Sequence, residues 1–126
     1  MFCRQLYLDE QTSKNYKSIC SKFHKQNYPS GIYVLVLSNI SGRVEYFDCK
    51  EFKQKYYKET GNFPLIIGLA KNASSAMNMV QKLIEETYAA TGTADVKSYL
   101  KEKNEEIKAK KNGIYKITVF EQEGEE

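Results

Sequence analysis

An uninterrupted apolar run, Ile32 to Leu37, constrains the fold of this chain more than any other segment. It has the length of a β-strand and is far shorter than the ~20 residues that a membrane-spanning helix needs. A strand without polar residues is typical of the centre of a sheet, where both faces are covered. We therefore expect a sheet with this strand near its middle. Pro64 to Ala70 is a second apolar strand, interrupted by Gly68.

Apolar spacing and turn residues predict the other elements. They are strands at 2–8, 43–47 and 114–120, and helices at about 12–27, 49–58, 73–91 and 93–111. The last of these helices becomes nearly all charged beyond Leu100, so we expect that end to project into solvent. The order β-α-β-β-α-β-α-α-β predicts a single α+β domain over residues 1–120. An acidic tail, 121–126, follows and is expected to be disordered.

Two arrangements of a five-stranded mixed or antiparallel sheet fit this order of elements. The first six elements match the ferredoxin-like order β-α-β-β-α-β, which places an antiparallel sheet against helices on a single face. The alternative is a mixed five-stranded sheet with helices on both faces.

Cysteine usage and the N-terminus indicate the cellular compartment. The three cysteines, Cys3, Cys20 and Cys49, form no CxxC pair and are an odd number, so reduced thiols fit better than disulfides. The segment Met1–Arg4 does not begin a secretory signal. We therefore expect a cytoplasmic protein with no membrane partner.

Catalytic and metal-binding constellations are poorly represented. His24 is the only histidine, and Cys20 lies four residues before it on the same predicted helix. Because Cys20 falls on the apolar stripe of that helix, an inert buried thiol explains the pair better than a nucleophile and its base. The pair Glu85-Glu86 lies on a hydrophilic helix face and is interpreted as solvated charge. We predict no catalytic residues, no metal site and no cofactor.

The segment from Gly68 to Ser75 is a candidate site for a small anionic ligand. It follows a predicted strand and opens a predicted helix, whose free N–H groups attract anions. Lys71, Ser74 and Ser75 could contribute further contacts. The segment matches neither a Walker A sequence nor GxGxxG, and a serine-capped helix start explains it as well.

The N-terminal half is a candidate nucleic-acid surface. Residues 1–62 carry ten Lys and Arg against six Asp and Glu, whereas residues 63–126 carry nine against ten. Basic side chains interleaved with aromatic ones suit phosphate contact and base stacking. A solvated lysine face is the alternative, and codon usage in an AT-rich genome would also enrich lysine. The candidate contact residues are Lys14, Lys17, Lys22, Lys25, Lys50, Lys53, Lys55 and Tyr57.

Association with a protein partner is the third possibility. Tyrosine is enriched at interfaces, and the chain has ten tyrosines. Tyr88 falls on the predicted core stripe of the helix at 73–91, together with Ile84 and others. The apolar final strand could form a sheet edge and pair with a second copy, giving a homodimer.

Part of the chain resembles short hypothetical proteins of clostridial, Firmicutes-type bacteria. The similarity lies in the segments 64–70, 84–88, 91–92 and 95–100, and in Cys3-Arg4-Gln5-Leu6-Tyr7 near the start. The resemblance implies a bacterial, intracellular setting and transfers no activity or residue role. From the residues, a non-catalytic binding or protein-interaction domain is the leading hypothesis. Nucleic-acid binding by the basic half and anion binding at 68–75 are the alternatives.

Overall fold

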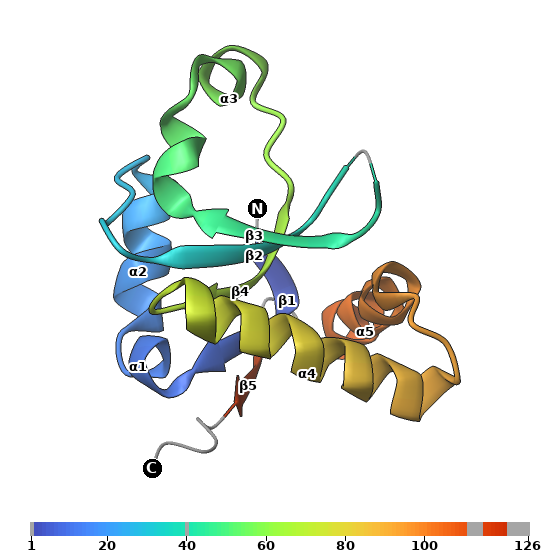
Figure 1. Ribbon diagram of the computed structural model, residues 1–126. Coiled ribbons are helices and arrows are strands. Elements are labelled where there is room, and N and C mark those ends of the chain that lie inside the picture. The colour runs from blue at the N-terminus through green and yellow to red at the C-terminus, as the bar shows by residue number, and fades with distance from the viewer. Residues whose placement is uncertain (1, 40, 111–114, 121–126) are drawn as a thin grey trace.

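The computed structural model of the protein describes residues 2–39, 41–110 and 115–120 (Figure 1). The α+β class and the order of strands and helices agree with the sequence-based expectation. The strands are β1 (Phe2–Asp9), β2 (Tyr33–Leu37), β3 (Val44–Asp48), β4 (Leu65–Ala70) and β5 (Lys116–Phe120). The helices are α1 (Glu10–Ser13), α2 (Tyr16–His24), the 3₁₀ helix η1 (Cys49–Lys53), α3 (Lys55–Thr60), α4 (Ala73–Thr91) and α5 (Val96–Lys110).

The strands form one mixed sheet in the order β3-β2-β4-β1-β5. β1 runs parallel to both of its neighbours, β4 and β5. β2 runs antiparallel to β3 and to β4. The ferredoxin-like alternative, with its antiparallel sheet, is therefore wrong, and the mixed five-stranded sheet is confirmed. The wholly apolar strand β2 lies inside the sheet, as its composition predicts.

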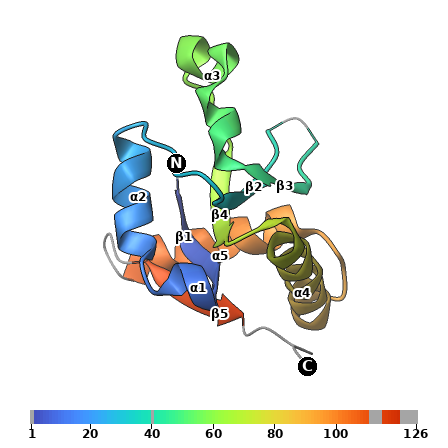
Figure 2. The same ribbon diagram turned by 60° about the vertical axis from the view of Figure 1, so that its left-hand side comes forward.

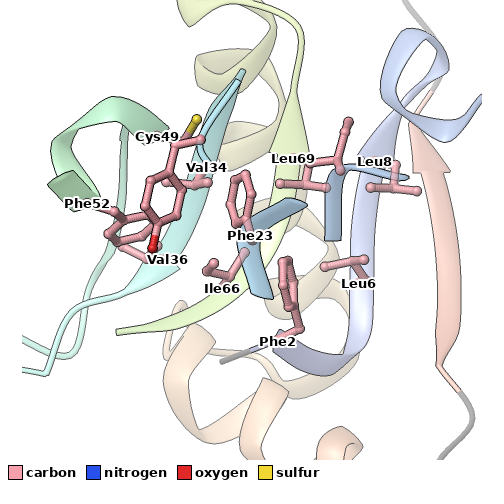
Figure 3. Packing of buried hydrophobic residues seen from close by; sticks show 12 residues of the cluster. Phe2, Leu6, Leu8, Phe23, Val34, Val36, Cys49, Phe52, Ile66 and Leu69 are labelled. Atoms are coloured by element: carbon pink, nitrogen blue, oxygen red, sulfur yellow. The ribbon is translucent and has the colours of Figure 1, made fainter. Parts of the chain in front are cut away.

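Helices cover both faces of the sheet, with α2 on one side and α4 on the other (Figure 2). On the α2 face, Phe23 points among Phe2, Ile66 and Leu69 of the sheet (Figure 3). On the α4 face, Leu83 and Leu100 bring α4 and α5 into a second cluster with Tyr7 of β1. Alternate residues of β1 thus enter opposite clusters, because successive side chains of a strand point to opposite faces.

Local sequence signals place the two ends of α4. The Asn72 side chain accepts a hydrogen bond from the Ser75 N–H, which satisfies one of the free amides of the first turn. Gly92 follows the helix at φ +80°, a left-handed conformation that glycine adopts without steric cost. The Asn72 cap thus fixes where the β4–α4 turn ends and the helix begins.

Several details differ from the expectation. The first helix is divided into α1 and α2, and the helix expected from Cys49 to Lys58 breaks at Gln54 into η1 and α3. The charged end of α5 does not simply project into solvent, because Asn104 Oδ1 accepts a hydrogen bond of 2.7 Å from the Arg4 N–H of β1. The tail 121–126 lies outside the described residues.

Two residues of the expected core stripe of α4 are in fact exposed. Ile84 and Tyr88 have exposed fractions of 40 % and 63 %. Leu83 and Thr87, which belong to the same expected stripe, are buried. The stripe is wider than the face that the sheet can cover, so one side of it is left at the surface.

Candidate functional site

Gly68 lies within β4 rather than in the turn that follows it. A Cβ atom at this position would stand 2.9 Å from the backbone oxygen of Tyr7 and 3.4 Å from Cβ of Leu35. The glycine therefore allows β4 to pack closely between β1 and β2. Close strand packing explains Gly68 without any ligand.

The β4–α4 turn surrounds a carboxylate of the chain itself, Asp9 at the end of β1. Asp9 Oδ2 accepts hydrogen bonds from the Lys71 N–H at 2.8 Å and the Ser75 hydroxyl at 2.7 Å. Asp9 Oδ1 accepts from the Thr12 N–H at 2.8 Å and the Thr12 hydroxyl at 2.9 Å. β1 and β4 are adjacent and parallel, and their chains continue to helices on opposite faces, so Asp9 occupies the crevice where doubly wound sheets bind ligands.

The hydrogen bonds keep Asp9 ionised although it is only 4 % exposed. Burial alone would raise the pKa of this carboxyl. The donors from Thr12, Ser75 and Lys71 outweigh burial and lower the pKa below its usual value. The anion that the turn contacts is thus a carboxylate of the protein itself. Ser75 and the backbone of Lys71 contact it, whereas Ser74 is exposed and Gly68 is inside the sheet.

A cleft of about 430 Å³ lies on the α2 face of the sheet, between α2 and the start of β5. We call it the α2–β5 cleft. Its floor is largely apolar, with the buried Leu6 of β1 beneath it. The parallel pairing of β5 with β1 brings Tyr115, which directly precedes β5, opposite the side chains of α2. The lining residues are Leu6, Tyr16, Lys17, Cys20, Ser21, His24, Lys25 and Tyr115.

Two of the candidate nucleic-acid contacts, Lys17 and Lys25, meet in this cleft. Lys14 and Lys22 are also exposed in this part of the chain, but they do not line the cleft. The Arg4 guanidinium lies 5.4 Å from the ring centre of Tyr115 and adds positive charge beside the cleft. None of the described residues that line it is acidic, and residues 11–44 contain no aspartate or glutamate. The described side chains that line this surface are therefore either uncharged or basic.

Cys20 and His24 both line the cleft, but their geometry does not provide a nucleophile. Burial raises the pKa of the Cys20 thiol to about 11. The thiol is therefore protonated at neutral pH, whereas the attacking species in cysteine chemistry is the thiolate. The ring of His24 lies 6.1 Å from that of Phe2 and contributes to the apolar wall.

The second lysine cluster, on η1 and α3, differs from the first. Acidic side chains lie among Lys50, Lys53 and Lys55, and Glu59 forms an ion pair of 3.7 Å with Lys55. Tyr57 is stacked on Phe63, with ring centres 5.2 Å apart and planes at 15°. This tyrosine also packs edge-on against Phe52 of the buried cluster, so it belongs to the core rather than to a free stacking surface.

Sequence reasoning missed a polar cluster on the opposite face of the sheet. The hydroxyls of Tyr7 and Tyr99 donate to Glu86 Oε2, at 2.6 Å and 2.7 Å. Burial and this carboxylate raise the pKa of Tyr7, and they raise the pKa of Tyr99 to about 12. Glu86 is thus not a solvated charge but a link between β1, α4 and α5. The pattern of α4 carries no signal for it, because both partners come from other elements.

Within the described residues, no three His, Cys, Asp or Glu side chains form a metal-binding group. Nor does any helix in the described part of the chain have the length and apolarity needed to cross a membrane. Comparison of the chain with protein-family models, with curated proteins and with solved structures found no match.

Proposed function

We propose that this protein is a non-catalytic binding domain that holds single-stranded nucleic acid in the α2–β5 cleft. The observation that carries the proposal is the composition of the cleft, in which two tyrosines and two lysines surround an apolar floor without a carboxylate. Proteins that bind single strands combine a positively charged groove with aromatic side chains on which the bases stack. Both requirements meet at this one place.

In this proposal the lysines and the tyrosines of the cleft contact different parts of a nucleotide. The exposed Lys17 and Lys25 suit phosphate groups as flexible point charges. Tyr115, which also contacts Arg4, and Tyr16, which packs partly against the buried cluster, both line the cleft and offer their remaining aromatic surface to unpaired bases. Stacking is insensitive to base identity. A duplex keeps its base faces stacked inside the helix, so it cannot cover the apolar floor. Preference for single strands over duplex is therefore expected.

Fluorescence anisotropy of a labelled oligothymidine at low salt tests the proposal. We expect binding that weakens as salt rises, since counterions are released from each neutralised phosphate. The double variant Lys17→Glu/Lys25→Glu should bind the oligonucleotide about tenfold more weakly or worse. The slope of the logarithm of the binding constant against the logarithm of the salt concentration should become shallower by about 1.4, because each of two lost phosphate contacts accounts for about 0.7. Absence of binding by the natural protein at low salt would overturn the proposal.

A charge-matched variant separates the cleft from general electrostatic attraction. Lys53→Glu/Lys58→Glu changes the net charge by the same amount, at exposed positions of η1 and α3. We expect this pair to lower affinity by no more than about threefold, as for charges that act only at a distance. Equal losses in the two double variants would show that binding follows net charge and does not use the cleft.

Cys20 gives a second readout that does not depend on charge. It is partly exposed in the cleft, whereas Cys3 and Cys49 are buried. In the folded protein, a thiol reagent should therefore modify Cys20 first, and slowly because its pKa is raised to about 11. Bound oligothymidine should protect Cys20 further. Unchanged labelling at saturating oligonucleotide would place the nucleic acid elsewhere.

A further inference from the structure

β3 is an edge strand whose outward backbone groups are not paired within the described residues. Its pairing with β2 covers one side only. The Arg43 C=O accepts a hydrogen bond from the Ser38 N–H, and the Cys49 N–H donates to the Ile32 C=O. The backbone groups of the odd-numbered residues of β3 therefore face β2. Because N–H and C=O directions alternate along a strand, the backbone groups of Val44, Tyr46 and Asp48 point outward. The strand contains neither proline nor lysine, which commonly protect such edges.

An exposed apolar stripe on α4 lies on the same face of the sheet as the Val44 side chain. Met77, Ile84 and Tyr88, spaced at seven and four residues, are 54 %, 40 % and 63 % exposed. A groove of about 430 Å³ separates Val80 and Ile84 from the β2–β3 connection and the start of α5. Met77, Gln81, Ile84 and Tyr88 share one helix side, on which no charged residue lies.

We propose that both features are covered by a second copy of this chain, with β3 pairing antiparallel to β3 of the partner about a two-fold axis through Tyr46. This register uses all three outward-facing residues in hydrogen-bonded pairs, Tyr46 with its own counterpart and Val44 with the partner's Asp48. Two aromatic rings then face each other across the axis, which stabilises an antiparallel pair. A register centred on Glu45 would place like charges opposite each other and turn its backbone groups the wrong way.

The same axis brings the two α4 stripes together. A two-fold axis perpendicular to the sheet keeps both α4 helices on one face and makes them antiparallel to each other. α4 contacts β3 more than it contacts β2, β4 or β1, so the helix lies towards the β3 edge and the axis. In this antiparallel pair, Met77 of one copy meets Tyr88 of the other.

The pairing leaves the α2–β5 cleft accessible. β5 is also an edge strand, as the sequence suggested, but it lies at the opposite end of the sheet from β3. β3 is the better interface because an apolar helix stripe and a row of outward backbone groups coincide there. The dimer and the proposed nucleic-acid site are independent, so either can fail without the other.

Sedimentation equilibrium of the natural protein up to about 100 μM tests the proposal, and we expect the mass of a dimer. Tyr46→Pro removes an outward N–H that has no partner among the described residues of the monomer, and Tyr88→Lys places a charge in the stripe. Each should give a folded monomer, as verified by circular dichroism. Tyr56→Lys changes a comparably exposed tyrosine on α3 and should leave the dimer intact.

Amide hydrogen exchange provides the decisive local readout. In the dimer, the N–H groups of Val44, Tyr46 and Asp48 should exchange at least about tenfold more slowly than in the Tyr88→Lys monomer. A natural protein that stays monomeric up to about 100 μM would overturn the proposal. So would a dimer that both Tyr46→Pro and Tyr88→Lys leave intact, or one in which these three amides exchange as fast as in the monomer.

Discussion

Asp9 holds three segments of the chain together through one side chain. Its carboxylate accepts from Thr12 on α1, and from Lys71 and Ser75 at the start of α4. Hydrogen bonds to an ionised group contribute about 1.5–3 kcal/mol each to stability, and a buried donor without its acceptor carries the full desolvation cost. The Asp9 carboxylate is therefore an ionised group on which much of the stability of this edge of the sheet depends.

The variant Asp9→Asn should lower the free energy of unfolding at pH 7 by about 2 kcal/mol or more. The amide NH₂ replaces one acceptor and must face either the donors of Thr12 or those of Lys71 and Ser75. Because the pKa of Asp9 is lowered by folding, the carboxylate stabilises the protein above its unfolded pKa of about 3.9. This stabilisation is lost as the pH falls through the folded-state pKa. Urea unfolding from pH 7 to about pH 2.5 should show the two proteins converging; a difference that does not depend on pH would contradict this account.

On the α4 face, the carboxylate of Glu86 likewise joins separate elements through hydrogen bonds from Tyr7 and Tyr99. Glu86→Ala should lower the free energy of unfolding by about 1–3 kcal/mol, since the buried Tyr7 hydroxyl loses its acceptor. In Glu86→Gln the negative charge is gone, and the pKa of Tyr99 should fall from about 12 towards its ordinary value near 10. Ultraviolet absorbance of the phenolate measures this titration. Glu85→Gln, one position away and exposed, is the matched control and should change neither quantity by much.

At the scale of elements, the approach of β4 to β1 depends on the missing side chain of Gly68. Gly68→Ala should destabilise the protein by about 3 kcal/mol, because the backbone oxygen of Tyr7 cannot move away without breaking strand pairing. Gly61→Ala is the comparison. Nothing lies within 4 Å of a Cβ added at Gly61, so the alanine is strained only by its left-handed φ of +68°. This conformation should lower the free energy of unfolding by about 1 kcal/mol. Urea unfolding of both variants measures the difference, and equal losses would contradict a steric role for Gly68.

The elements themselves were largely predictable because their signals are local. Apolar spacing and turn residues predicted a helix at 73–91, which is α4, and the apolar run of β2 predicted an interior strand. The exposure of Ile84 and Tyr88 was not predictable, since helical periodicity identifies an apolar side but not how much of it the sheet covers. Asn104 contacts β1 from the charged end of α5, where periodicity alone gave no reason to expect packing.

For the whole molecule, the sequence left the sheet order open, and the candidate site depends on that order. The α2–β5 cleft exists because β5 pairs with β1, which brings Tyr115 to the side chains of α2. No local pattern encodes a pairing between strands so far apart in the chain. Lys17 and Lys25 were proposed from charge alone, whereas their placement in one cleft, apart from the lysines at 50–55, could be seen only in the fold.

The pairing of β1 with β5 also has a consequence for how the chain reaches this structure. Gln5 pairs with Lys116 and Leu6 with Ile117, so β1 gains its second neighbouring strand only after the distant β5 has been synthesised. Until then, β1 presents an open and strongly apolar edge to other chains. Sheets closed by such distant contacts fold in milliseconds to seconds rather than microseconds. Until β5 is in place, this edge of β1 can pair with other chains, as exposed strand edges of partly folded proteins do.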